Sequence, residues 1–294
     1  MHRPRTASAL ILLLAVSLSP VSLAAQQPWC GTESPSRTVA AQYRAELSAA
    51  HLTPHAKDLK PIPIALHVIW DGKRGKLTQG QVDTLINNIN WAYQDTPFQF
   101  YIARLDLTKN ASWFNNCNSN TRNNMAMKKR LARDSRYYIN IYSCNPYDPS
   151  VPPGLYVLGL STLPFQYPNG SYLHGILVHP NAFPGGAPDQ PYGLTTAHEI
   201  GHYLGLFHTF ESHFNASGDP CDDPGDFIAD TPTQNGPTFA CPASTDSCPA
   251  LPGNDDVPNF MNYSTDECMN HFTPNQIGTM IVATATYRPT LGHY

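Results

Sequence analysis

The sequence lacks an excess of positive charge and, after its first residues, lacks long apolar runs. Its 294 residues include 18 Lys and Arg against 22 Asp and Glu, which gives a formal net charge of −4. This balance leaves no basic patch, so neither nucleic acid nor an anionic membrane surface is expected as a partner. No stretch beyond the amino terminus is long and apolar enough for a membrane helix. Internal repeats and low-complexity tracts are also absent.

The first 25 residues have the pattern of a signal peptide. Residues 1–5 are basic, residues 9–18 form an apolar run too short to span a bilayer, and cleavage is expected after Ala24 or Ala25. We therefore expect the protein to be secreted into the extracellular space. Residues 26–60 are predicted to be a pro-segment, with a modest helix over 39–50 and a proline-punctuated stretch over 51–63. Residues 61–294, roughly 230 in number, suit a single domain.

Because we expect the protein to be secreted, we also expect disulfides and glycosylation. Four N-x-S/T sequons fit a secreted glycoprotein, at Asn110, Asn169, Asn215 and Asn262. The cysteines number seven: Cys30, Cys117, Cys144, Cys221, Cys241, Cys248 and Cys268. In an oxidising compartment most of them should pair, and an odd count leaves one over. Four follow the motif described next, in a region poor in regular structure that we expect disulfides to hold together.

Residues 195–208 contain the pattern H-E-x-x-H-x-x-G-x-x-H. On a helix, His198 and His202 lie one turn apart on one face, so both imidazoles can reach one metal ion. Gly205 suits a left-handed exit that ends the helix and brings His208 to the same ion. Three nitrogen ligands leave a fourth tetrahedral position for water, as in a catalytic zinc site. Glu199 adjoins the first ligand and would face that water as a general base.

The motif also has two plainer interpretations than a zinc site. The histidines can be ordinary surface residues with Met261 as a core methionine, but the glycine and third histidine make an accidental match harder. Thr196 and Glu199 also fit a helix capping box, in which Glu199 would only cap the helix. The histidine pair around Glu199 favours the metal role. Three histidines in or beside strands are expected to be structural and outside the site, namely His67, His174 and His179.

The hydrophobic pattern predicts a mixed α/β fold. Strands are expected over 62–70, 98–105, 137–142, 154–161 and 172–179. Helices are expected after the capping boxes at Thr78 and Thr273, and over 124–133 with Met125 and Leu131 facing inward. Strands separated by helices before a central zinc helix favour a twisted mixed sheet with helices packed on it. The part after the zinc helix would be an irregular, disulfide-linked subdomain.

Cys30 has two interpretations. A thiolate is an excellent zinc ligand, so a pro-segment cysteine can occupy the open coordination position and keep the protein latent, as in a zymogen. Alternatively, Cys30 pairs with Cys117 or Cys144. The residues alone leave both open.

The chain resembles the pappalysin family of metzincins, most of all its secreted fungal and bacterial branch. The resemblance rests on HEIGHYLGLFHTF at 198–210, GDFIADTP at 225–232, NFMNYS at 259–264, and FTPNQ at 272–276. It covers almost the whole chain after the signal, including Cys30-Gly31-Thr32. The long zinc-binding pattern and the later Met-turn, at Met261, together form the metzincin signature. One departure is His174-Gly175, where family members usually carry Asp-Gly.

The resemblance implies further features of the site. It implies disulfides Cys221–Cys248 and Cys241–Cys268, which leave Cys117–Cys144 as the remaining pair and Cys30 unpaired. It implies that Met261 lies beneath the histidines and that Tyr263 stabilises the oxyanion. It also implies a calcium ion near Asp226 and Thr231, although such an acidic loop can equally be just solvated.

The sequence thus predicts a secreted zinc endopeptidase whose catalytic domain is 61–294. Metal-activated water would hydrolyse peptide bonds, with Glu199 as base, Zn²⁺ as cofactor and protein or peptide substrates. We expect a monomer. The resemblance also implies that the chain just after the Met-turn lines the pocket for the residue that follows the scissile bond. Asp266 and Glu267 stand there, so we expect Arg or Lys at that substrate position. The alternatives are another zinc peptidase of narrow, peptide-hormone-like specificity and a secreted zinc-binding protein or toxin module without significant turnover.

Overall fold

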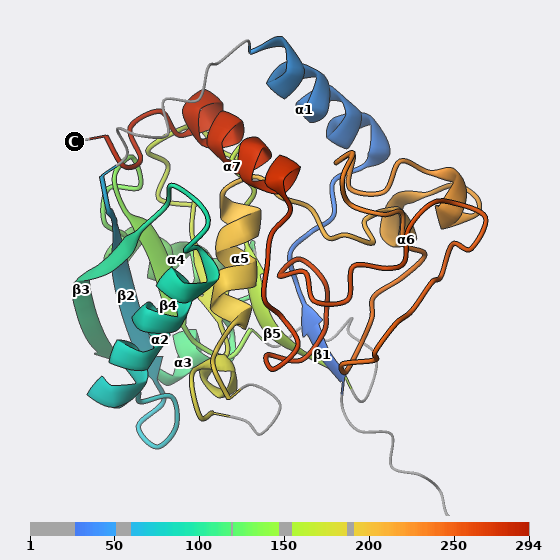
Figure 1. The fold of residues 1–294 in the computed structure, drawn as a ribbon. Helices are drawn as coiled ribbons and strands as arrows, with labels where there is room; N and C mark the ends of the chain where they lie inside the picture. Colours follow the sequence, from blue (N-terminus) through green and yellow to red (C-terminus); the bar gives the residue numbers. More distant parts are fainter. Residues whose placement is uncertain (1–26, 51–59, 119, 147–154, 187–190, 294) are drawn as a thin grey trace, which may run out of the picture.

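The computed structural model describes residues 27–50, 60–118, 120–146, 155–186 and 191–293. The predicted signal peptide lies outside them. A six-stranded sheet in the order β1-β5-β6-β4-β2-β3 organises the fold (Figure 1). The strands are β1 Gln27–Cys30, β2 Ile62–Trp70, β3 Phe100–Lys109, β4 Ile139–Ser143, β5 Leu155–Ser161 and β6 Ile176–Val178. All neighbours pair in parallel except β5 and β6. The predicted mixed sheet is confirmed.

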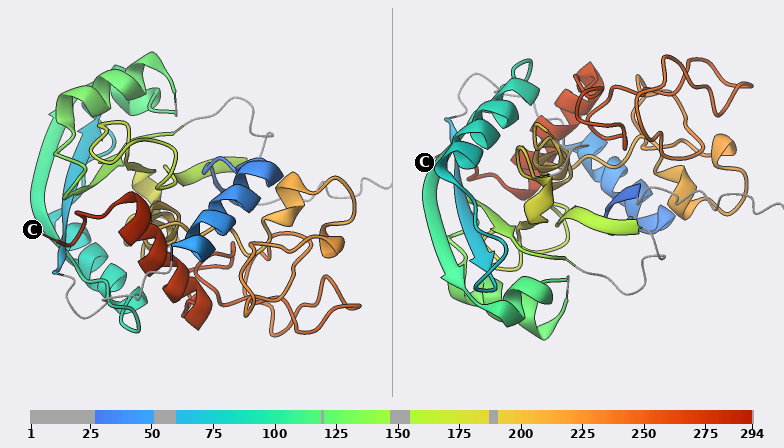
Figure 2. Two further views of the ribbon diagram at one scale, coloured as in Figure 1. Left: turned by 90° about the horizontal axis from the view of Figure 1, so that it is seen from above. Right: turned by 90° about the horizontal axis from the view of Figure 1, so that it is seen from below.

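Helices cover both faces of the sheet (Figure 2). They are α1 Arg37–Ala49, α2 Gln79–Ala92, α3 Ala111–Asn115, α4 Arg122–Leu131, α5 Thr195–Tyr203, α6 Ser212–Asn215 and α7 Pro274–Tyr287, with short 3₁₀ turns η2 Pro180–Ala182 and η3 Pro220–Asp222. Helices α2 and α5 pack on one face, and α3 and α4 on the other. Alternation along β2 supplies both cores, because Ile64 faces α2 and Ile69 faces the opposite cluster.

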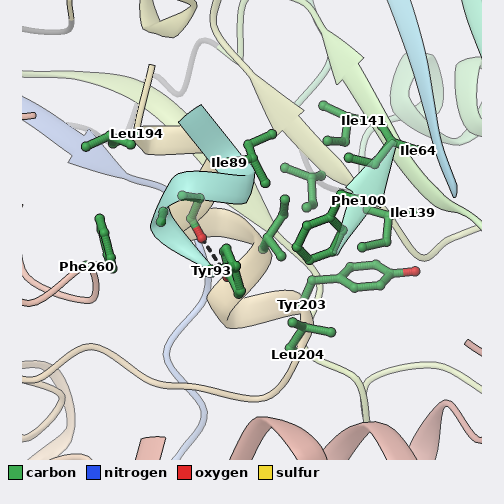
Figure 3. Close-up of a cluster of buried hydrophobic side chains, with 14 of the residues drawn as sticks. Ile64, Ile89, Tyr93, Phe100, Ile139, Ile141, Leu194, Tyr203, Leu204 and Phe260 are labelled. Carbon is green, nitrogen blue, oxygen red and sulfur yellow. Dashed lines mark hydrogen bonds between the residues drawn. The ribbon is translucent and has the colours of Figure 1, made fainter. Parts of the chain in front are cut away.

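The core between α2, α5 and the sheet fixes the position of the metal-motif helix (Figure 3). Ile89 of α2 and Tyr93, the C-cap residue of that helix, meet Ile139 and Ile141 of β4 there. The buried phenol of Tyr93 donates a hydrogen bond to the carbonyl oxygen of Ala197 at 2.9 Å. This bond locks α5 against α2, so the helix that carries the histidines is rigidly placed.

After α5 the chain is mostly irregular. Two disulfides link distant parts of this region to each other, Cys221–Cys248 and Cys241–Cys268. A third disulfide, Cys117–Cys144, lies in the core on the face of the sheet that α3 and α4 cover. These are the pairings that the family resemblance implies. The thiol of Cys30 is free and buried, so its pairing with Cys117 or Cys144 is ruled out.

Several local predictions are confirmed. Strand β2 has the predicted bounds, and the capping boxes at Thr78 and Thr273 are both formed. Helix α1 begins two residues before the predicted start because the Ser36 hydroxyl accepts a hydrogen bond from Val39 N.

Three local predictions were wrong or incomplete. Met125 is 41% exposed, and Met127 is the buried residue of α4 instead. The capping box at Thr196 does not form, because Leu194 is the N-cap of α5 and makes no side-chain bond. Strand β1 was not predicted. It has no alternating apolar pattern and forms by pairing with the edge of β5.

The four sequons differ in their surroundings. Asn262 is fully buried, so it cannot carry a glycan in the folded protein. Asn110 caps α3, and the Asn169 side chain bonds Thr290 and Arg288. Glycosylation stays a prediction. Within the described ranges no helix is long and apolar enough to cross a membrane.

Candidate metal and catalytic site

Helix α5 and the turn after it bring three histidines together. His198 and His202 lie one turn apart on α5. Gly205 has φ +111°, and its N–H donates to the carbonyl of His202 at 2.9 Å. A side chain on Gly205 would lie 2.2 Å from the Tyr43 phenol, so only glycine fits. The chain then reverses and returns His208 to the same point.

The three ring nitrogens converge. His202 Nε2 lies 3.1 Å from His198 Nε2 and 3.2 Å from His208 Nε2. All three side chains are buried. Cys30 joins them, with its Sγ 3.6 Å from His202 Nε2. Within the part of the chain that the structure describes, these four residues form the one group of three or more His, Cys, Asp or Glu whose ligand atoms lie within 4.8 Å of one another.

The other ring nitrogens fix the tautomers. His198 Nδ1 donates to the Phe260 carbonyl at 2.7 Å, and His202 Nδ1 donates to the Leu206 carbonyl at 2.8 Å. Burial lowers the pKa of His198 to about 3 and that of His202 well below its usual value, so both rings are neutral. Each Nε2 therefore presents a lone pair to its neighbours. Lone pairs in contact repel each other, and a cation between them removes that repulsion.

The spacings fit zinc. Two nitrogens at 2.0–2.1 Å from a tetrahedral ion lie about 3.3 Å apart, and a nitrogen and a thiolate sulfur on the same ion lie about 3.6 Å apart. The nitrogen separations of 3.1 and 3.2 Å and the sulfur separation of 3.6 Å agree with these values. Three imidazoles and one thiolate are also ligands that zinc prefers.

Glu199 lies beside this cluster and is fully buried. Its Oε2 accepts a hydrogen bond from the Thr32 hydroxyl at 2.9 Å. Burial raises the pKa of its carboxyl to about 8. Gly159 of β5 makes room for the carboxylate, because a Cβ on Gly159 would stand 2.6 Å from Glu199 Oε1.

The predicted Met-turn lies directly under the histidine helix. Met261 is buried, and a Cβ on Gly201 of α5 would stand 2.5 Å from its Sδ. The Asn259 side chain holds the turn by accepting a hydrogen bond from Met261 N at 2.9 Å. The Tyr263 phenol lies 3.4 Å from His208 Nε2, accepts from Cys30 N at 3.2 Å and donates to Cys30 O at 3.3 Å.

The amino-terminal segment therefore runs across the site. Strand β1 pairs in parallel with β5, and Cys30 lies against the histidines. Thr32 follows, donating to Glu199 and accepting from Ser161 N at 2.8 Å. Helix α1 packs further on against α7 and the turn at Gly205.

The residues that the resemblance links to calcium lie together but form no carboxylate cluster. Burial raises the pKa of the Asp226 carboxyl well above its usual value, and the Thr231 side chain lies beside this carboxyl. Asp226 Oδ1 accepts a hydrogen bond from Ile228 N at 2.9 Å. Calcium at this position stays a prediction.

Asp266 has a structural position that the sequence did not suggest. It is buried, and its carboxylate accepts hydrogen bonds from the backbone N–H groups of Tyr192 and Gly193 at 2.8 Å and of Leu194 at 3.3 Å. These bonds anchor the loop that enters α5. Of the two predicted acidic residues, Glu267 is the exposed one. The preference for Arg or Lys stays a prediction, and Asp266 gives it less support than expected.

The sequence did not predict a role at this site for three residues. Thr32 and Glu211 make hydrogen bonds there, and Gly159 leaves room for Glu199. The Glu211 carboxylate lies 3.2 Å from His208 Nδ1. The sequence does contain a clue to Glu211, because an acidic residue three positions after His208 can reach the ring of that histidine. No local pattern identifies Gly159. The three strand histidines, His67, His174 and His179, lie outside the metal cluster as expected.

Known proteins are similar to this chain over most of its length. The family model described as pregnancy-associated plasma protein-A matches residues 169–285. An extracellular metalloprotease of Colletotrichum graminicola is 33% identical over 288 residues, covering 94% of this chain and 97% of that protein. An extracellular metalloprotease of Arthroderma benhamiae is 33% identical over 273 residues, covering 91% and 94%.

Solved structures agree on the fold. A promirolysin mutant of Tannerella forsythia superposes with a TM-score of 0.71 at 23% identity, covering 90% of this chain and 97% of that chain. Mature mirolysin of the same organism, in complex with a cleaved peptide, gives 0.64 at 24% identity and covers 80% and 96%. The chain therefore belongs to the pappalysin family of metzincin metalloproteases.

Proposed function

We propose that the chain is a secreted zinc endopeptidase whose ligands are His198, His202 and His208 and whose general base is Glu199. The observation that carries the proposal is the convergence of three buried imidazoles, with Nε2 separations of 3.1 and 3.2 Å, next to a buried carboxyl group. Membership in a metalloprotease family supports a zinc peptidase that acts on proteins or peptides. The relatives are named extracellular, which supports secretion and the predicted signal peptide.

Each residue of the site has a defined task in peptide hydrolysis. When bound, zinc supplies Lewis acidity, which lowers the pKa of water from about 15.7 toward 7 and polarises a carbonyl group. Glu199 accepts the proton of the attacking water and later donates it to the leaving amine. The Tyr263 phenol donates a hydrogen bond to the oxyanion as the carbonyl becomes tetrahedral. Met261 packs under α5 and keeps the imidazoles in place.

The amino-terminal segment would keep this enzyme latent. Cys30 Sγ lies 3.6 Å from His202 Nε2, where it would take the fourth ligand position, Thr32 donates a hydrogen bond to the carboxyl group of Glu199, and the Tyr263 phenol donates one to the carbonyl oxygen of Cys30. Residues 30–32 would therefore block the metal, the general base and the oxyanion donor together. The pro-form of mirolysin also aligns over more of this chain than the mature form does, at 90% against 80%. This difference supports a removable pro-segment over 26–60 and a catalytic domain over 61–294.

The test compares Glu199→Gln with the wild type, both expressed as the full chain and allowed to mature. Zinc content should stay the same, because Glu199 is not a ligand, while casein hydrolysis should be lost. Wild-type activity should disappear with a zinc chelator and return with zinc. Asp83→Asn, an exposed charge change on α2, serves as the matched control. Full activity of Glu199→Gln would refute the base assignment, and an inactive, zinc-loaded wild type would favour a binding protein or toxin module.

A further inference from the structure

The three histidines are oriented by partners of two chemical kinds. His198 and His202 donate from Nδ1 to backbone carbonyl groups, whereas His208 Nδ1 faces the Glu211 carboxylate. We propose that Glu211 is a positioning residue that orients His208 and makes it a stronger metal ligand. The inference rests on the proposed zinc site and adds to it a residue whose role lies in metal affinity.

Glu211 and His208 form a closed turn. Oε2 of Glu211 lies 3.2 Å from His208 Nδ1 and accepts a hydrogen bond from His208 N, also at 3.2 Å. In the opposite direction, Glu211 N donates to the His208 carbonyl oxygen at 3.0 Å. Both side chains are 1% exposed. The carboxylate therefore fixes both the backbone of His208 and the orientation of its ring.

The rest of the His208 ring is surrounded by aromatic side chains. Phe210 stacks on it at 5.0 Å between centroids, and Phe214 and Tyr263 approach edge-on at 5.7 and 5.3 Å. Among the described residues, Glu211 supplies the hydrogen-bond acceptor for Nδ1. Since neutral imidazole carries one N–H, donation from Nδ1 leaves the Nε2 lone pair facing the other histidines.

The charge of Glu211 matters as well as its geometry. A zinc ion brings two positive charges into a site whose histidine side chains are all buried. A carboxylate hydrogen-bonded to the distal nitrogen of a ligand raises the basicity of that ligand more than a carbonyl does, and losing such a partner typically lowers metal affinity about 10- to 100-fold. An amide in its place keeps an acceptor for the N–H but removes the charge. The two contributions can therefore be separated.

The experiment measures zinc affinity of the full chain by competition with a chromophoric chelator. Glu211→Gln should weaken zinc binding about tenfold, and Glu211→Ala should approach the upper end of the 10- to 100-fold range. Asp95→Asn removes an exposed carboxylate and should leave the affinity unchanged. With Co²⁺ in place of zinc, the visible absorption bands should shift in Glu211→Ala, because they report the ligand geometry.

A merely structural role gives a different result. It would lower the unfolding temperature of the metal-free variants while leaving the Co²⁺ spectrum of the folded variants unchanged, and this outcome would overturn the proposal. Equal zinc affinity of Glu211→Gln, Glu211→Ala and wild type would overturn it too, with the ligand assignment intact. A wild type that binds no zinc would instead overturn the proposed function together with this inference. If Glu211→Ala fails to fold, the zinc affinity of Glu211→Gln still tests the proposal.

Discussion

Tyr43 provides the sharpest test of how the amino-terminal segment is held. Its side chain is 2% exposed and lies against Phe165, Phe207 and Tyr287. Its phenol donates a hydrogen bond to the carbonyl oxygen of Gly205 at 2.8 Å. That carbonyl belongs to the turn just after the metal-motif helix, where backbone acceptors have no partner within the helix. Helix α1 thus contacts the turn after α5 directly, in addition to the contacts that Cys30 and Thr32 make with the histidine site.

The size of the effect of Tyr43→Phe follows from this burial. The ring contacts stay, but the Gly205 carbonyl loses its donor in a site without water access. An unsatisfied buried acceptor costs about 1–3 kcal/mol. Since the hydrogen bond exists only while α1 is docked, the docking equilibrium should weaken by about 5- to 150-fold.

The assay is the initial rate of peptide hydrolysis by the intact, zinc-loaded full chain, with gels to show that no cleavage has occurred. Tyr43→Phe should raise this basal rate above the low wild-type value by about 5- to 150-fold. Tyr172→Phe alters a 41% exposed phenol and should behave like the wild type. An unchanged basal rate together with a lower unfolding temperature would show that Tyr43 contributes only general stability, and the reasoning would then be wrong.

Three further predictions concern the site itself. Cys30→Ser should raise the basal rate of peptide hydrolysis by the intact chain, and the double variant with Tyr43→Phe should be faster still. Equal rates for Cys30→Ser and the wild type would contradict the proposed latent state. Gly159→Ala should reduce kcat at least about tenfold with zinc content unchanged, because the new Cβ displaces the Glu199 carboxylate; Gly278→Ala, where a Cβ meets nothing within 4 Å, is its control. Burial raises the pKa of Glu199 from 4.5 to about 8. Between these pH values the folded state keeps a proton that the unfolded state releases. The free energy of unfolding should therefore fall as pH rises from 4.5 to about 8. In chelator, the stability advantage of Glu199→Gln over the wild type should grow from pH 5 to 8 and then level off, and a pH-independent difference in denaturant titrations would argue against the shift.

The sequence predicts the parts of this fold that local patterns encode. The β-branched run of β2 and the Thr78 capping box gave the right elements, because each depends on residues adjacent in the chain. Met125 was placed inward by its hydrophobicity. The helix turns Met127 to the core instead, since its phase is set by the sheet it packs on.

The candidate site divides in the same way. His198, His202 and His208 follow from spacing alone, because a helix and a glycine turn determine where they lie. Gly159 and Thr32 come from segments distant in sequence, and their closeness to Glu199 depends on how β1 and β5 pair. Strand β1 itself has no strand pattern, so neither contact was available before the structure.

The most direct measurement is the metal content of the purified full chain. We expect one zinc ion per chain, removed by a strong chelator, and a much lower zinc affinity in His208→Ala, which deletes the proposed ligand that follows the Gly205 turn. A preparation that is folded yet contains no stoichiometric zinc, or one in which His208→Ala holds zinc as tightly as the wild type, would contradict this expectation.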